Sequence, residues 1–225
     1  MKILSIDVGI YNLAICLLDV DDTVTKILFW KDINILAGKQ TCSVKKCKRV
    51  ATHIKDDQYY CIKCKTSLYP NQRLQTIKTA MNTSIEKIAE LLYATLDTEL
   101  QNIEYDRVLI ENQPTRNIKM KNISMLLLGY FTIKHSTIEF VNASKKMQET
   151  TINSYKNTYA NTYTNTYANR KKSSKLAVKS LLKDSDWSLF FKCSKKQDDL
   201  SDCLLQGLWW IHKNINKDII LSFEQ

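Results

Sequence analysis

The chain has 225 residues, of which 44% are hydrophobic, and its 33 Lys+Arg against 23 Asp+Glu give a formal net charge of +10. This length fits one or two small domains with a buried core, and no stretch approaches the roughly 18 consecutive apolar residues of a membrane span. The four glycines are too few and too scattered for a G-x-G-x-x-G or P-loop motif. Rossmann dinucleotide enzymes and P-loop NTPases are therefore excluded, and we expect no membrane association and no nucleotide cofactor.

Apolar runs and helical periodicity predict the elements in chain order. Strands are predicted over 2–10, 12–20, 24–33, 107–111 and 137–143, and helices over 73–100, 119–131, 173–182 and 198–212. Strands first, then helices interleaved with further strands, indicate an α/β protein with a five-stranded mixed sheet flanked by helices. We treat residues 1–225 as a single domain on this basis.

Two segments interrupt the pattern. Residues 38–66 carry a cluster of cysteines and are interpreted as an inserted subdomain. Residues 157–169 read NTYANTYTNTYAN, a low-complexity repeat with no apolar face, and are expected to form a mobile loop. Repeat slippage accounts for its tyrosines, with stacking on nucleobases as the alternative.

The excess positive charge is concentrated in two regions. Residues 145–196 contain 12 basic side chains against three acidic ones, and residues 38–66 contain eight against two. Segregation of this kind is typical of a protein that binds a polyanion, most often nucleic acid. A lysine-rich composition inherited from AT-rich coding would explain the total, but explains the segregation less well.

Four acidic residues occupy positions suited to metal-dependent chemistry. Asp7 and Glu111 each end an apolar strand, while Asp199 and Asp202 lie three residues apart on one face of a predicted helix. Taken singly, each has an ordinary explanation as a turn former, a strand end or a helix cap. Together, carboxylates without basic partners suit Mg²⁺ or Mn²⁺, and two such ions would support hydrolysis of a phosphodiester.

Three segments resemble the acidic motifs of RuvC-like Holliday junction resolvases: Ile6-Asp7-Val8-Gly9-Ile10, Ile110-Glu111-Asn112-Gln113-Pro114, and Lys195 to Asp202. The similarity is greatest to the branch of poxviruses and other large DNA viruses, which is related to the fungal mitochondrial resolvases. It spans the chain from Ile3 to Trp210, apart from the two interrupting segments. The resemblance implies a ribonuclease H-like fold, a homodimer, and Mg²⁺- or Mn²⁺-dependent paired nicking of four-way DNA junctions.

The resemblance also implies roles for individual residues. Asp7, Glu111, Asp199 and Asp202 become the ligands of two metal ions, and Lys196 lies near the scissile phosphate. The doubled aspartate leaves Asp198 as an alternative to Asp199, although the spacing to Asp202 favours Asp199. The residues expected to contact DNA are Gln113, Arg116, Lys119, Lys121, Arg170, Lys171, Lys172 and Lys195.

The cysteine cluster reads Cys42-x4-Cys47-x13-Cys61-x2-Cys64, with His53 between the two pairs. Two pairs at this spacing predict one structural Zn²⁺ ion held by four thiolates. The wide first pair leaves His53 open as a substitute ligand, and reduced thiols without metal are the remaining alternative. Metal binding would supply the folding energy that so short a segment lacks.

The sequence therefore predicts a crossover junction endonuclease that makes paired nicks through direct attack by water and leaves 5′-phosphate and 3′-hydroxyl ends. The alternatives are an RNase H or transposase-like nuclease on the same fold, a non-catalytic zinc-containing nucleic-acid-binding protein and, with least support, an actin-like ATPase. The first ten residues lack a signal or transit peptide pattern. We expect an intracellular protein, in the host cytoplasm or at a viral replication site if the viral resemblance holds.

Overall fold

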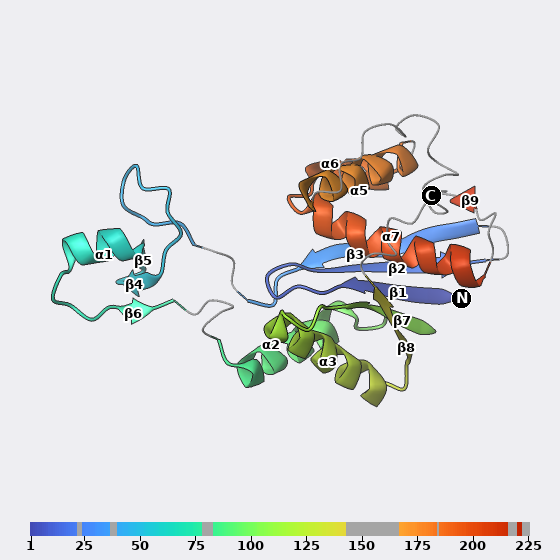
Figure 1. Cartoon of the computed structure of the whole chain (residues 1–225), viewed down its shortest axis with the longest axis horizontal. Helices are drawn as coiled ribbons and strands as arrows, with labels where there is room; N and C mark the ends of the chain where they lie inside the picture. Colours follow the sequence, from blue (N-terminus) through green and yellow to red (C-terminus); the bar gives the residue numbers. More distant parts are fainter. Residues whose placement is uncertain are drawn as a thin grey trace.

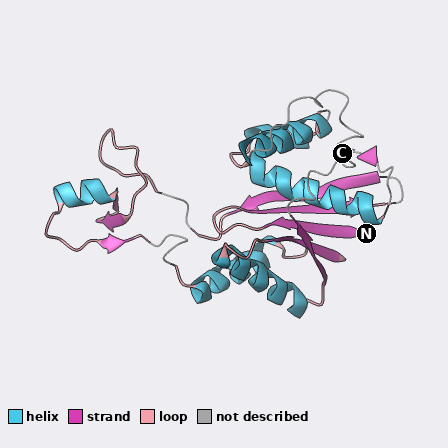
Figure 2. Ribbon diagram, viewed as in Figure 1, coloured by secondary structure: helices cyan, strands magenta, loops and turns pink. Residues whose placement is uncertain are grey.

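The computed structural model describes residues 1–21, 24–36, 40–77, 83–142, 167–183, 185–215 and 220–221. A mixed sheet in the order β8-β7-β1-β2-β3-β9 has helices on both faces (Figures 1 and 2). A second sheet, in the order β5-β4-β6, stands apart from the first in Figure 1. The predicted five-stranded mixed sheet is confirmed, and the two-residue β9 adds a short edge strand beside β3.

The strands are β1 Lys2–Asp7, β2 Leu13–Val20, β3 Val24–Ile33, β4 His53–Lys55, β5 Gln58–Tyr60, β6 Gln75–Thr76, β7 Arg107–Asn112, β8 Thr137–Asn142 and β9 Ile220–Leu221. The helices are α1 Ile62–Leu68, α2 Ile85–Glu99, α3 Ile118–Ile133, α5 Tyr167–Leu181, α6 Trp187–Cys193 and α7 Gln197–Asn214.

The first three strands form an antiparallel meander, and β7 and β8 continue the sheet in parallel with β1. In the register of β1, β2 and β3, Asp7 lies opposite Ala14, and Ala14 lies opposite Asp32. On the other side of β1, Ile6 lies opposite Ile110. The ends of β1 and β7 that carry Asp7 and Glu111 therefore lie next to each other in the sheet.

Alternation along the strands decides which face each side chain takes. Ile3 of β1 and Leu109 of β7 belong to the core beneath α5, α6 and α7. The intervening residues of the same strands pack against α2 and α3: Leu4, Ile6, Val108 and Ile110. Because side chains alternate with a period of two, Asp7 and Glu111 share the face that α7 covers.

Helix α7 lies very close to the sheet at Gly207. A Cβ atom at this position would lie 2.6 Å from Leu18 Cδ1 and 3.3 Å from Ser5 Cβ. We expect Gly207→Ala to destabilise the protein by about 1–3 kcal/mol in urea unfolding, because the helix or the sheet must shift. The control is Gly129→Ala in α3, whose new Cβ would make only an ordinary contact at 3.6 Å with Tyr93 Oη. That variant should gain roughly 0.5–1 kcal/mol from helix propensity, and equal losses in both would contradict the close approach at Gly207.

Three element boundaries differ from the sequence-based expectation. The helix predicted from Arg73 begins only at Ile85, where the Ser84 side chain caps it, and Gln75–Thr76 instead forms strand β6 against β4. The small sheet thus reaches ten residues beyond position 66. Helix α5 begins at Tyr167 rather than at Ser173, and the short helix α6 was not predicted at all.

The Asn-Thr-Tyr repeat falls largely outside the described residues. Only its last three positions, 167–169, are described, and they form the first turn of α5. No helix among the described residues is long and apolar enough to cross a membrane.

Candidate active site

A cavity of about 370 Å³ opens at the end of β1. Its lining comprises Asp7, Val8, Gly9, Ile10, Tyr11, Asn12, Asn117, Lys119, Met120 and Asp199. The loop after β1 forms one wall because it folds tightly on itself: a Cβ atom at Gly9 would lie 2.2 Å from the carbonyl oxygen of Asn12. Only glycine fits there, and this tight loop leaves the Asp7 carboxylate, 7% exposed, at the base of the cavity.

The two neighbouring aspartates at the start of α7 have different environments. Burial raises the pKa of Asp199 to about 6, and the negative charges of Asp198 and Asp7 contribute. Burial also favours a higher pKa for Asp198. The Lys171 ammonium, 2.6 Å from Asp198 Oδ2, outweighs this effect and holds the pKa of Asp198 below its ordinary value. Asp199 lines the cavity together with Asp7, whereas Asp198 lies outside the lining and makes the shorter ion pair with Lys171.

The raised pKa of Asp199 has a consequence for stability in the absence of divalent metal. In the unfolded chain this carboxyl has its ordinary pKa near 4, so its contribution to stability is complete below about pH 4 and is lost as the pH rises through about 6. We expect Asp199→Asn to raise the melting temperature by about 2–6 °C at pH 8 and to leave it unchanged at pH 4. The melting temperatures are measured in Mg²⁺-free buffer, without a chelator because a chelator would remove zinc. An equal rise in melting temperature at both pH values would contradict the role of the Asp199 charge.

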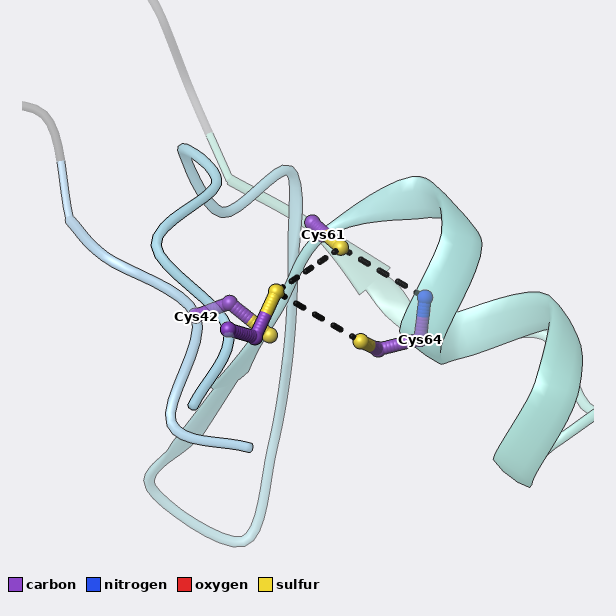
Figure 3. A group of neighbouring side chains, drawn as sticks. Cys42, Cys61 and Cys64 are labelled. Carbon is purple, nitrogen blue, oxygen red and sulfur yellow. Dashed lines mark hydrogen bonds between the residues drawn. The ribbon is translucent and has the colours of Figure 1, made fainter. Parts of the chain in front are cut away.

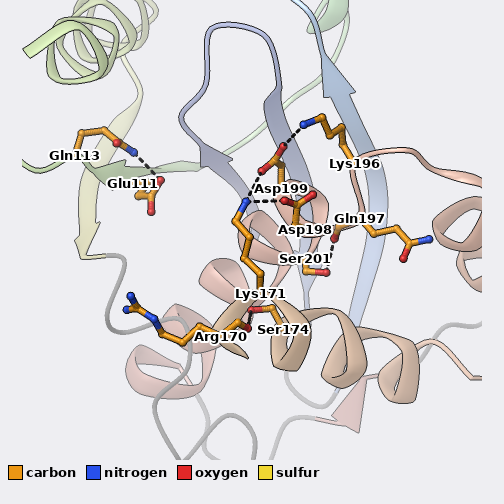
Figure 4. A network of polar contacts seen from close by, with 10 residues as sticks. All are labelled: Glu111, Gln113, Arg170, Lys171, Ser174, Lys196, Gln197, Asp198, Asp199 and Ser201. Atoms are coloured by element: carbon orange, nitrogen blue, oxygen red, sulfur yellow. Dashed lines mark hydrogen bonds and ion pairs between the residues drawn. The ribbon is translucent and has the colours of Figure 1, made fainter. Parts of the chain in front are cut away.

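Two lysines lie beside the acids (Figure 4). Lys171 of α5 reaches both Asp198 and, at 3.7 Å, Asp199 Oδ1, while Lys196 Nζ lies 3.8 Å from Asp199 Oδ2. With its amide oriented to suit its neighbours, Asn12 accepts a hydrogen bond from Lys196 Nζ at 3.1 Å. The acids are therefore bordered by fixed positive charge, which is the arrangement that a phosphate group requires.

The other two predicted acids lie outside the cavity lining among the described residues. Glu111 ends β7 on the face that α7 covers, and its Oε2 accepts a hydrogen bond of 2.6 Å from Gln113 Nε2 (Figure 4). Asp202 lies one turn after Asp199 in α7 and is half-buried. Asp7, Glu111 and the first turns of α7 thus meet at one end of the sheet.

A buried polar contact fixes α7 against the two strands that carry acids. The Gln206 amide nitrogen donates to Ser5 Oγ at 3.2 Å, to the carbonyl oxygen of Ile6 at 3.2 Å and to that of Leu109 at 3.3 Å. Ser5 Oγ in turn donates to the carbonyl oxygen of Cys203 at 2.7 Å. Because unsatisfied buried polar groups are costly, these bonds favour one position of α7 along β1 and β7.

The residues expected to contact DNA are placed in different ways. Arg116, Arg170, Lys172 and Lys195 are exposed. Lys119 and Lys121 are half-buried and already engaged: Lys119 Nζ donates to the carbonyl oxygen of Thr83 at 2.7 Å, and Lys121 Nζ donates to Asn112 Oδ1 at 3.1 Å.

Sequence reasoning missed Asp32 as a neighbour of the site. It lies at the end of β3, in the same cross-strand row as Asp7, and burial raises its pKa. The Lys196 charge opposes this shift and the Asp198 charge adds to it, so Asp32 is electrostatically coupled to the start of α7. The available signal was an acid near the end of a long apolar strand, the same signal that identified Asp7.

The four cysteines of the inserted segment converge on one point. Their sulfur atoms all lie within 4.8 Å of one another, with Cys47 Sγ 3.8 Å from Cys61 Sγ and 3.7 Å from Cys64 Sγ. Figure 3 shows Cys61 and Cys64 at the start of α1 and Cys42 on the facing loop. A tetrahedron with metal–sulfur bonds of 2.3 Å has edges of about 3.8 Å, so these two sulfur–sulfur separations suit a single tetrahedral ion.

The close approach of these thiols shifts their pKa values in opposite directions. The backbone N–H of Cys64, which donates to Cys61 Sγ at 3.4 Å, lowers the pKa of Cys61 to about 6. The hydrogen bond to the Cys61 sulfur, together with burial, raises the pKa of Cys64 to about 12. His53 lies outside this group, and its Nδ1 lies 2.8 Å from Thr52 Oγ1. The cluster could therefore hold a metal ion with four sulfur ligands and without His53.

Solved structures of Holliday junction resolvases share this fold. The fowlpox virus Holliday junction resolvase in complex with its substrate junction DNA superposes with a TM-score of 0.53 at 16% identity, covering 95% of this chain and 98% of the other. The Thermus thermophilus RuvC in complex with a Holliday junction gives 0.51 at 11% identity, covering 96% and 98%. No curated protein matches the sequence.

The chain therefore has the RuvC-like, ribonuclease H-like fold, with a group of acids at one end of its sheet. More specifically, the chain belongs to the mitochondrial resolvase Ydc2 / RNA splicing MRS1 family, whose model matches residues 3–128 and 121–220. The resemblance found in the three acidic segments is thereby confirmed.

Proposed function

We propose that this protein is a metal-dependent endonuclease that resolves four-way DNA junctions by paired, symmetric nicks. The observation that carries the proposal is the facing pair Asp7 and Asp199 in one cavity, bordered by Lys171 and Lys196, in a chain that belongs to a resolvase family. Acids alone are common at strand ends, but a buried acid whose pKa is raised by burial and by neighbouring acids, beside fixed cations, is typical of a catalytic centre.

The donor set fits two Mg²⁺ or Mn²⁺ ions, held by Asp7, Glu111, Asp199 and Asp202. Hard divalent cations prefer carboxylate oxygens, and a cation would relieve the repulsion from Asp198 and Asp7 that adds to the effect of burial on the pKa of Asp199. When bound, such ions supply activation of water and stabilisation of the leaving oxygen of a phosphodiester. The expected products carry 5′-phosphate and 3′-hydroxyl ends, with no covalent link to the protein.

The protein's own side chains bind and orient the strand. Lys196, fixed between Asn12 and Asp199, is placed to hold the scissile phosphate, and Lys171 keeps Asp198 neutralised outside the cavity. Gln206 keeps the acids of α7 in register with those of β1 and β7. The flanking backbone contacts come from Gln113, Arg116, Lys119, Lys121, Arg170, Lys172 and Lys195.

The two cuts require two active sites, because one site reaches one strand. A twofold homodimer matches the twofold symmetry of a four-way junction. Helix α3 leaves the large apolar side chains of Ile118, Met125 and Ile133 exposed, at 70%, 39% and 74%. These provide apolar surface for the association, which sedimentation of the purified protein would measure.

Residues Cys42, Cys47, Cys61 and Cys64 are proposed to bind one structural Zn²⁺ ion. The sulfur–sulfur separations of 3.7 and 3.8 Å support this proposal. Helix α1 has no buried residue, so it contributes little to a hydrophobic core that could hold the segment together. The ion would replace a hydrophobic core as the source of folding energy for this segment.

The test uses end-labelled four-way junction, linear duplex and RNA–DNA hybrid of matched sequence, each incubated with the purified protein and Mg²⁺. We expect paired nicks in the junction alone, at symmetric positions and with ligatable ends. Cutting of the hybrid would favour an RNase H, and cutting of linear duplex a transposase-like nuclease. Tight binding without cutting would favour a non-catalytic role, and because the family description also names RNA splicing, a structured RNA belongs in the binding panel.

A further inference from the structure

Residues 40–77 form a small folded unit that the active site does not explain, here called the cysteine module. It contains β4, β5, β6 and α1 around the four cysteines. Its sequence carries eight Lys and Arg against two acids. A zinc ion with four thiolates carries a net charge of −2. The module remains strongly positive when this charge is included.

Four of the module's lysines are exposed and make no ion pair within the module. Lys45, Lys46, Lys48 and Lys63 all have exposed side chains. The two acids, Asp56 and Asp57, are the central residues of the tight turn between β4 and β5, with φ of 48° and 58°. No ion pair joins two residues of 40–77, all of which are described. The basic surface is therefore available to a partner.

The chain enters the module from the rim of the candidate active site. Strand β3 ends at Ile33, one residue after Asp32, which shares a cross-strand row with Asp7. The backbone N–H of Ile35 then donates to the carbonyl oxygen of Ile10 at 3.3 Å, and Ile10 lines the cavity.

The chain also returns to that rim. Thr83, the first described residue after the module, accepts a hydrogen bond from Lys119 through its carbonyl oxygen, and Lys119 lines the same cavity. At roughly 3.5 Å per residue, the chain between Leu36 and residue 40 spans at most about 15 Å. Both ends of the basic module are thus tethered beside the acids.

We propose that the cysteine module binds the sugar–phosphate backbone of a duplex arm of the junction, next to the strand held at Asp7 and Asp199. This rests on the proposed function, because the arm belongs to the same DNA that is cut. Exposed lysines without carboxylate partners release counterions from DNA and give affinity without reading sequence. The module thereby extends the DNA contact beyond the cavity.

The test is a variant with four exposed charges removed, Lys45→Ala, Lys46→Asn, Lys48→Ala and Lys63→Ala. Asn is chosen at position 46 because the backbone there has a φ of 65°, which Asn tolerates well. Arg49 is retained because its guanidinium is hydrogen-bonded to the Cys61 sulfur. Zinc content equal to that of the wild type shows that the module remains folded.

Binding to a four-way junction is measured in Mg²⁺-free buffer across a series of salt concentrations. We expect Kd to rise about 10- to 100-fold near 0.15 M salt, and the slope of log K against log salt to fall in magnitude by up to about 3.6 for four lost contacts. The matched control removes four lysines at the opposite end of the sheet and helices: Lys2, Lys26, Lys134 and Lys213, each to Ala. It should bind and cleave like the wild type.

An unchanged Kd and slope in the module variant would overturn the inference, since a surface reserved for a protein partner would give this result. An equal loss in the control would also overturn it, because the effect would then reflect total charge. If the wild type binds the junction through the module but cuts no DNA, the proposed nuclease function fails and the binding role stands, so the two failures are distinguishable.

Discussion

Asp7→Asn is expected to reduce single-turnover cleavage of a four-way junction by about a thousandfold or more while leaving junction binding in Mg²⁺-free buffer intact. Asp7 lines the cavity together with Asp199 and, among the acids that the structure describes, is the one most completely enclosed by the protein. Asn keeps the size of the side chain but removes the charge that a divalent cation needs, and losses of this order are usual when a central catalytic group is removed. Cleavage rates at saturating protein, followed with a labelled junction, measure the effect.

Two adjacent aspartates provide the matched control. Asp199→Asn should lose activity to the same extent as Asp7→Asn, whereas Asp198→Asn should remain within about tenfold of the wild type, because Asp198 is paired with Lys171 outside the cavity. The opposite order would show that the register of the third acidic segment is shifted by one residue. Full activity in Asp7→Asn would remove the cavity from consideration as the active site.

Cys61→Ser is expected to abolish zinc binding and to unfold the cysteine module while the large sheet remains folded. Cys61 is the N-cap of α1 and its sulfur lies next to that of Cys47. Because Ser can still cap the helix, the change removes the metal ligand alone. Structural zinc sites contribute on the order of 10 kcal/mol to the folding of the small units that they hold together. Zinc content of the purified protein, together with hydrogen exchange over residues 40–77, measures the result.

The controls separate this ion from general thiol chemistry. Cys193→Ser changes an exposed cysteine outside the cluster, and His53→Gln changes the imidazole that the sequence left open as a ligand. Both variants should retain one zinc ion per chain. Loss of zinc in His53→Gln with retention in Cys61→Ser would contradict the four-cysteine assignment.

Much of the fold was predictable because the central strands β1, β2 and β7 are buried on both faces. Near-continuous apolar runs marked β1, β2 and β7, and an acid that interrupts such a run is conspicuous, which is how Asp7 and Glu111 were found. The spacing of Asp199 and Asp202 similarly follows from helical geometry alone. These features are local, so a single sequence contains them.

The remaining features depend on contacts between distant segments. Lys171 and Asp198 are 27 residues apart in sequence, and nothing local shows that they pair. Leu74 and Ile77 continue the apolar period of α2, yet the backbone N–H of Ile77 donates to the carbonyl oxygen of Thr52 and the segment joins the small sheet. Periodicity indicates which side chains are buried. The segment against which they pack is decided by long-range pairing, which a single sequence does not show.

The placement of α7 gives the molecule a built-in order of assembly. This helix supplies Asp199 and Asp202 and also core residues such as Leu200 and Leu204, and it follows the five main strands along the chain. A ribosome therefore releases β1 and β7 long before the segment that completes both the hydrophobic core and the acidic set. Nascent or prematurely terminated chains therefore hold an incomplete set of the proposed ligands, and on the proposed mechanism they gain the capacity to cut DNA only together with the finished fold.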